Sequence, residues 1–156
     1  MSLQSVVEVL GENPIFRKVH PKRLRVVARM GETLHYRPGE RLFERGEEGD
    51  SAFVVIDGSV DVLVPVEDGE AAVARLGRGE VFGEMAVLTD APRSTAIAAH
   101  DPLEVLRIDR GALLSLLREF PDISIELIRL LARRLAATTR DYAEARAALD
   151  RQGGGG

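Results

Sequence analysis

The chain has 156 residues and no cysteine, and its 21 basic and 25 acidic residues give a formal net charge of −4. That sign argues against a main role in binding polyanionic nucleic acid, and the lack of cysteine excludes disulfide and thiolate chemistry and suits a reducing cytoplasm. No apolar run approaches the ~20 residues of a membrane-spanning helix. We therefore expect neither a membrane partner nor direct nucleic-acid binding.

Residues 1–30 are expected to form a short helical segment. Apolar residues recur there at mixed helical spacing between breaks at Gly11, Pro14 and Pro21. Because proline is favoured at the first position of a helix, Pro21 is expected to open the second main helix of this segment.

Residues 31–109 change to short β-rich runs separated by glycine. The runs lie at 33–36, 41–43, 52–56, 60–64, 72–76, 96–99 and 104–108. Strands this short, broken at intervals of roughly ten residues, are typical of a compact antiparallel barrel or roll. We predict a mainly β fold: an antiparallel β-roll, of the double-stranded β-helix or jelly-roll kind, between N-terminal helices and a long C-terminal helix.

Residues 110–150 return to a helical pattern. One helix is expected from Gly111 to Phe120, before Pro121, and a longer one from Asp122, a residue type common at N-caps, to Leu149. The remaining residues, 151–156, end in glycines and are expected to form a flexible tail.

The predicted helix over 122–149 carries an apolar seam with heptad spacing. Intervals of three and four residues alternate along Ile128, Leu131, Leu135, Thr138, Tyr142, Ala145 and Leu149. One interpretation is that the seam packs on the roll. We favour a partner helix in a homodimer, because a helix of this length spans ~40 Å and reaches beyond a small roll.

The segment 82–96 carries the most chemical information. Gly83 permits a close backbone approach, and the helical turn that can follow it has free N–H groups that favour an anion. Arg93 can offer a planar guanidinium to phosphate oxygens, and Ser94 adds a hydroxyl donor. Glu84 would repel phosphate, so it needs either a cation or a hydroxyl donor beside it, and a ribose 2′-hydroxyl is the natural candidate. A cyclic 3′,5′-monophosphate meets both demands.

This segment resembles the phosphate-binding cassette of the cyclic-nucleotide-binding domain family. The matching residues are Phe82-Gly83-Glu84-Met85-Ala86-Val87-Leu88 and Pro92-Arg93-Ser94. Turns at 37–40, 46–50 and 57–60 resemble the family's turn motifs in the same order, so the resemblance covers about residues 14–142. The family includes the catabolite activator protein and the regulatory subunits of cyclic-AMP-dependent protein kinase. The resemblance implies an eight-stranded β-roll whose last helix closes over the base.

The resemblance also implies a role for each cassette residue. Glu84 would accept the ribose hydroxyl, and Arg93 would neutralise the phosphate with the help of Ser94. The residues that would shape the site and donate around the ligand are Gly83, Met85 and Ala86. The order Arg93-Ser94-Thr95-Ala96 departs from the commoner Arg-Ser-Ala-Thr, which leaves the role of Thr95 in the ligand site open.

In the long helix, residues 132–135 followed by a threonine pair are similar to the dimer helix of the catabolite activator protein, whose hydroxyl pair contacts the adenine amino group. The similarity implies that Thr138 contacts the base, that Thr139 reaches in from the partner chain, and that Arg134 supports the site. Cyclic AMP is therefore the expected ligand. Cyclic GMP stays an alternative, because some guanine-selective members use a hydroxyl at the position of Ser94.

Other interpretations remain open. Glu84 and Arg93 could form a structural ion pair with each other. The chain could also be the sensory half of a catabolite-activator-type transcription regulator without its helix-turn-helix, or a dimerisation module without ligand. No catalytic residue, metal site or cofactor is expected, because the three histidines, His20, His35 and His100, are scattered singly. The sequence names no downstream effector.

Overall fold

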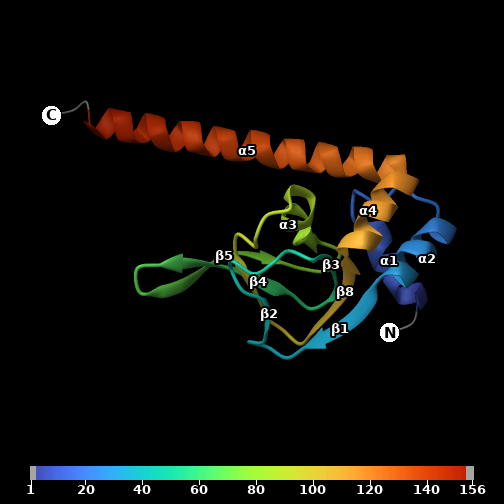
Figure 1. The fold of residues 1–156 in the computed structure, drawn as a ribbon. Helices are drawn as coiled ribbons and strands as arrows, with labels where there is room; N and C mark the ends of the chain where they lie inside the picture. The colour runs from blue at the N-terminus through green and yellow to red at the C-terminus, as the bar shows by residue number, and fades with distance from the viewer. Residues whose placement is uncertain (1–2, 154–156) are drawn as a thin grey trace.

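The computed structural model describes residues 3–153 and confirms the predicted β-roll (Figure 1). Two antiparallel four-stranded sheets have the strand orders β1-β8-β3-β6 and β2-β7-β4-β5. The strands are β1 (Glu32–Tyr36), β2 (Arg41–Phe43), β3 (Ser51–Asp57), β4 (Val60–Val66), β5 (Gly69–Leu76), β6 (Val81–Phe82), β7 (Ala96–Ala99) and β8 (Leu103–Asp109). The helices are α1 (Leu3–Glu12), α2 (Pro21–Met30), α3 (Glu84–Thr89), α4 (Arg110–Glu119) and α5 (Pro121–Gly153).

Strand β3 joins the two hydrophobic cores of the molecule. Successive side chains of a strand point to opposite faces. Ala52, Val54 and Ile56 face the core shared with the helices, whereas Phe53 and Val55 face the core inside the roll. All five are buried. This continuous apolar run is what a strand covered on both faces requires, and it places the roll interior directly behind the helical layer.

The N-terminal helices pack on the outside of the roll. As predicted, α2 begins at Pro21, and the side chain of His20 caps it by accepting a hydrogen bond from the Lys22 backbone N–H. Leu24 and Val27 are buried in the helical core. The other side of α2 faces solvent, so this helix presents one apolar and one polar face.

Helix α5 is longer than the sequence predicts at both ends. It begins at Pro121, one residue before Asp122, and includes residues 151–153, where a flexible tail is expected. Nothing in the sequence breaks a helix before Gly153, and Arg151 in the last turn suits the negative end of the helix dipole. The rest of the expected tail, 154–156, lies outside the described residues. No helix within residues 3–153 is long and apolar enough to cross a membrane.

Helix α5 extends away from α4 and runs over the side of the roll that carries α3, as Figure 1 shows. Its buried residues are Ile123 and Leu127, both in its first two turns. The predicted seam faces solvent: Ile128, Leu135, Tyr142 and Leu149 are 64–68% exposed. These four side chains therefore do not pack on the roll of their own chain, although Leu131 is partly buried against the helical core.

Candidate functional site

A cavity of about 400 Å³ lies beside the cassette predicted from the sequence. It brings together seven of the nine predicted site residues, Gly83, Glu84, Met85, Ala86, Arg93, Ser94 and Thr95. Arg134 of α5 also lines it. Glu80 and six apolar side chains form the rest of the wall, so the cavity combines a few polar groups with a largely apolar lining, as small-molecule sites usually do.

The local backbone holds the cassette close to its neighbours. Gly83 has a φ of +81°, in the left-handed region that favours glycine, and immediately precedes α3. A Cβ atom at this position would lie 2.7 Å from Nη1 of Arg93. At Gly49 a Cβ would lie 2.2 Å from the Cβ of Ala86. Gly49 is therefore needed for the close approach of α3 to the roll, and Gly83 for the close approach of the Arg93 guanidinium to the backbone before α3.

Glu84 is buried, with 3% of its surface exposed. Its Oε1 accepts a hydrogen bond from Nη1 of Arg134 at 2.8 Å. A buried carboxylate without a partner is costly, so this bond stabilises the ligand-free site. The bond also connects the cassette to α5, because Glu84 belongs to the cassette and Arg134, 50 residues later, belongs to α5.

Arg93 is equally buried, with 4% of its surface exposed. Its Nη1 donates to the Gly83 carbonyl at 2.8 Å, and its Nη2 donates to the Ser51 carbonyl at 2.7 Å. Its Nε is buried and has no hydrogen-bond partner among the described residues. Burial lowers the pKa of the Arg93 guanidinium from its ordinary value, and the nearby Asp50 carboxylate opposes part of that effect.

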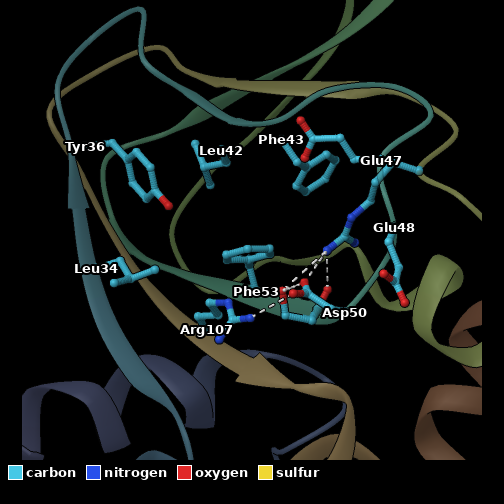
Figure 2. A pocket seen from close by; sticks show the side chains of 11 residues that line it. Leu34, Tyr36, Leu42, Phe43, Glu47, Glu48, Asp50, Phe53 and Arg107 are labelled. Atoms are coloured by element: carbon cyan, nitrogen blue, oxygen red, sulfur yellow. Dashed lines mark hydrogen bonds and ion pairs between the residues drawn. The ribbon is translucent and has the colours of Figure 1, made fainter.

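Arg93 separates the cassette cavity from a second cavity of about 450 Å³, because its side chain lines both. The guanidinium carbon lies 4.1 Å from the centroid of the Phe43 ring, which also lines both cavities. Figure 2 shows the second cavity, where Asp50 faces Arg107. Oδ2 of Asp50 accepts from Nη2 of Arg107 at 3.2 Å, and Oδ1 of Asp50 lies 3.9 Å from Nη2 of Arg93. Asp50 therefore links the two arginines.

The structure does not bring every predicted residue to the cavity. Thr138 and Thr139 are exposed and do not line it. Thr138 lies four residues, about one helical turn, after Arg134, so both threonines continue along α5 from the cavity's edge. Glu84 and Arg93 do not form the structural ion pair that was considered as an alternative, because Glu84 bonds Arg134 and Arg93 bonds backbone carbonyls.

Sequence reasoning missed several contributors to the site. The apolar wall comes from Phe43, Val62, Leu76, Val81, Phe82 and Ile97. The alternation of side chains along a strand could have indicated Val62, because it lies two residues after Val60 and therefore faces the same side of the predicted strand as that buried residue. The carbonyl of Ser51 carries no signal in the sequence, because any residue has a backbone oxygen. Arg134 was expected only to support the site, and it bonds Glu84 directly.

The arrangement suits a ligand with three different parts. The buried guanidinium of Arg93 favours an anion, since arginine presents several N–H donors to phosphate or carboxylate oxygens. The carboxylate of Glu84 accepts from hydroxyl or amino donors. The apolar wall suits a flat ring. A phosphate, a hydroxyl-bearing sugar and an aromatic base are the parts of a nucleotide.

The chain is similar to known proteins over most of its length. Residues 33–120 match the model of the family described as "Cyclic nucleotide-binding domain". The chain is 30% identical to the "CRP-like cAMP-activated global transcriptional regulator" of Mycobacterium tuberculosis, over 88% of its own length and 62% of the regulator. It is 29% identical to a lysophospholipase of Chaetomium globosum over 90% of its own length, but only 10% of that enzyme.

The structure of the catabolite activator protein of Thermus thermophilus superposes with a TM-score of 0.79 at 30% sequence identity. The match covers 84% of this chain and 62% of that protein. The chain thus spans about six tenths of the length of the transcription regulators that it resembles. Together with the cassette cavity, the family match over residues 33–120 shows that this chain belongs to the cyclic nucleotide-binding domain family.

Proposed function

We propose that the cassette cavity binds a cyclic 3′,5′-nucleotide, with cyclic AMP preferred, and that the chain acts as a regulatory sensor without chemistry of its own. The observation that carries the proposal is that a buried carboxylate, Glu84, and a buried guanidinium, Arg93, line one cavity of about 400 Å³ without pairing with each other. Each is thus available for a different part of one ligand.

Arg93 is the proposed phosphate ligand. Two of its donors already bond carbonyl oxygens, whereas the buried Nε has no partner among residues 3–153. A buried donor without a partner costs about 1–3 kcal/mol, so a phosphate oxygen that gives this group a partner gains more than it would at an exposed arginine. Ser94 lines the same cavity and can add a hydroxyl donor.

Glu84 is the proposed acceptor for the ribose 2′-hydroxyl. Its carboxylate has more acceptor positions than the single bond from Arg134 uses, so the hydroxyl can add to that bond or replace it. Replacement would release the contact that ties α5 to the cassette, and addition would make the Glu84 carboxylate shared between the ligand and α5. Ligand binding is therefore coupled to the position of α5, which is the proposed route of the signal to an effector that the chain does not identify.

The base is proposed to lie under α5 of a homodimer. The exposed seam of α5 gives two copies a shared apolar surface, with Thr138 on the seam and Thr139 beside it. In this arrangement Thr138 contacts the base from its own chain, and Thr139 reaches it from the partner chain. Their hydroxyl groups favour the adenine amino group, although cyclic GMP remains the competing ligand because Ser94 offers a hydroxyl to guanine.

A calorimetric titration of the purified chain with cyclic AMP and with cyclic GMP tests the proposal. We expect saturable binding of both ligands, with the tighter dissociation constant for cyclic AMP. The absence of binding by either ligand, in a chain that sedimentation shows to be a dimer, would replace the proposal with a dimerisation module. Tighter binding of cyclic GMP would reverse the proposed preference.

The wider role is that of a sensory module. The relatives that match over most of this chain include transcription regulators, and the chain matches about six tenths of their length. The second candidate function is accordingly the sensory half of such a regulator. Fusing a DNA-binding domain after α5 tests this candidate, since cyclic-AMP-dependent DNA binding by the fusion would support it and ligand-independent binding would not.

A further inference from the structure

Charge is distributed unevenly along the chain. Residues 13–31 contain six basic residues and no acidic residue. Residues 32–109, which form the roll, contain 17 acidic and seven basic residues. The net charge of −4 therefore conceals a basic N-terminal helical region attached to an acidic roll.

The basic residues of the helical region are displayed on the surface. All six are exposed: Arg17, Lys18, Lys22, Arg23, Arg25 and Arg29. Within residues 3–153 only Lys18 of this set forms an ion pair, with Glu126 at 3.7 Å, and that side chain is 74% exposed. The other five thus have no ion-pair partner within residues 3–153, although the carboxylate of Asp122 lines a surface hollow together with Lys18 and Arg23.

Helix α2 holds much of this charge in a fixed arrangement. Lys22, Arg25 and Arg29 are spaced by three and four residues, which places them along one face of the helix. The opposite face is anchored in the core by Leu24 and Val27. The helix thus presents a row of cations outward and has no free apolar face to insert elsewhere.

Two apolar side chains are exposed among these cations. Val26 is 43% exposed and lies on α2 between Arg25 and Arg29. Ile125 is 47% exposed and lines a surface hollow of mixed charge with Lys18, Asp122, Glu126 and Arg129. We name Val26, Ile125 and the six basic residues of 13–31 the basic face. Cations complement anionic lipid headgroups, and exposed apolar side chains can contact the boundary between headgroups and acyl chains.

We propose that the basic face binds the surface of an anionic lipid bilayer, independently of the cyclic-nucleotide function. Uncompensated cations near an anionic bilayer each strengthen adsorption roughly fivefold. Val26 and Ile125 add contacts that a bilayer interface can use and that the phosphate backbone of a nucleic acid cannot. The expectation of no membrane partner rested on the absence of a membrane-spanning helix, and none is present within residues 3–153. Adsorption to a bilayer surface needs no spanning helix, so that absence does not oppose the proposal.

The shape of the molecule fits this orientation. Figure 1 shows α2 at one end and the β4–β5 hairpin, whose turn carries Glu67 and Asp68, at the other. Charges separated by more than about 8 Å are largely screened at physiological ionic strength, so acidic groups at the far end repel the bilayer only weakly. The cassette cavity has no α2 residue in its lining and stays open.

Vesicle co-sedimentation tests the proposal. We expect the intact chain to sediment with vesicles of phosphatidylcholine containing 30% phosphatidylserine, to remain free with phosphatidylcholine alone, and to be released by 0.5 M salt. Reversing the row on α2 (Lys22→Glu, Arg25→Glu and Arg29→Glu) should weaken binding at least about 100-fold, from roughly fivefold for each cation. The matched control reverses three arginines on α5 instead: Arg140→Glu, Arg146→Glu and Arg151→Glu. It changes the net charge by the same amount and should still bind the anionic vesicles strongly.

Comparing probes separates a bilayer from other anionic partners. Val26→Gln should weaken vesicle binding severalfold while the charge is unchanged, which supports contact with the interface. If a 30-base-pair DNA duplex binds more tightly than the vesicles and Val26→Gln has no effect, the basic face is a nucleic-acid surface and the proposal is wrong. Equal vesicle binding by the α2 and α5 variants, each folded by circular dichroism, would also overturn it.

Discussion

The roll and α5 contribute to the candidate site to very different degrees within one chain. The roll's contribution is already in place: Glu84 and Arg93 are both at least 96% buried, and each is held by hydrogen bonds at 2.7–2.8 Å. The α5 contribution consists of one arginine at the cavity's edge, and Thr138 and Thr139 face solvent. The groups proposed to bind phosphate and sugar are thus already held in place, whereas the two threonines proposed to contact the base do not line the cavity.

This difference indicates a division of labour. Preorganised groups provide affinity at little entropic cost, because their side chains are ordered before the ligand arrives. Groups on a partly free helix can move, so they suit the transmission of a signal. Variants that affect one region without the other separate these two roles.

The largest expected effect is on the association of two chains. Leu135→Asp with Tyr142→Asp should convert a dimer into a monomer, because four side chains of the pair, each worth about 1.5–3 kcal/mol when buried, would become charged at the interface. Sedimentation equilibrium measures the result. The control is Ala136→Asp with Ala147→Asp, which adds the same charge away from the seam and should leave the dimer intact. If the wild-type chain is already a monomer, the proposed pairing of two α5 helices is wrong.

The next effect is on the phosphate contact in the roll. Arg93→Ala should weaken cyclic AMP binding by about 2 kcal/mol, or roughly 30-fold, because a charge-assisted contact in a buried site is lost. Arg93→Lys should restore only part of the affinity, because an ammonium group lacks the planar fork of arginine. Calorimetric titration of both folded variants measures this, and affinities equal to wild type would discard Arg93 as the phosphate ligand.

A smaller effect is expected at the junction between the two regions. Arg134→Ala leaves the buried carboxylate of Glu84 without its partner. The free energy of unfolding should fall by only about 1 kcal/mol, because the half-exposed arginine is partly screened by solvent. Thermal unfolding should then shift downward by about 2–4 °C. Arg133→Ala, the exposed neighbour, should shift it less. Equal shifts in the two variants would mean that the bond to Glu84 contributes little.

Sequence patterns predict the roll better than they predict its contacts. Glycine-separated runs located most strands within a few residues, but β6, Val81–Phe82, was missed because two residues show no periodicity. Pro21 marked the start of α2 correctly, since proline acts locally. The expectation of a flexible tail from residue 151 ends α5 too early, because a helix continues until something stops it and the first glycine of the tail is Gly153.

The same limit applies to the candidate site. The cassette motif located Gly83, Glu84 and Arg93 beside one cavity, because a short segment fixes their separation. It could not indicate that Arg93 bonds the Ser51 carbonyl or that Glu84 bonds Arg134, since these partners are 42 and 50 residues away. Such contacts depend on how the roll closes and where α5 lies, which are properties of tertiary packing.

The most direct test of the account is whether Glu84 recognises the sugar hydroxyl. We predict that the wild-type chain binds cyclic AMP roughly tenfold or more tightly than 2′-deoxy cyclic AMP, because a hydrogen bond to a buried charged group contributes about 1.5–3 kcal/mol. Glu84→Ala should bind both nucleotides with equal, weaker affinity. A wild-type chain that does not distinguish them, or a variant that keeps the preference, would contradict the assignment of Glu84 to the ribose.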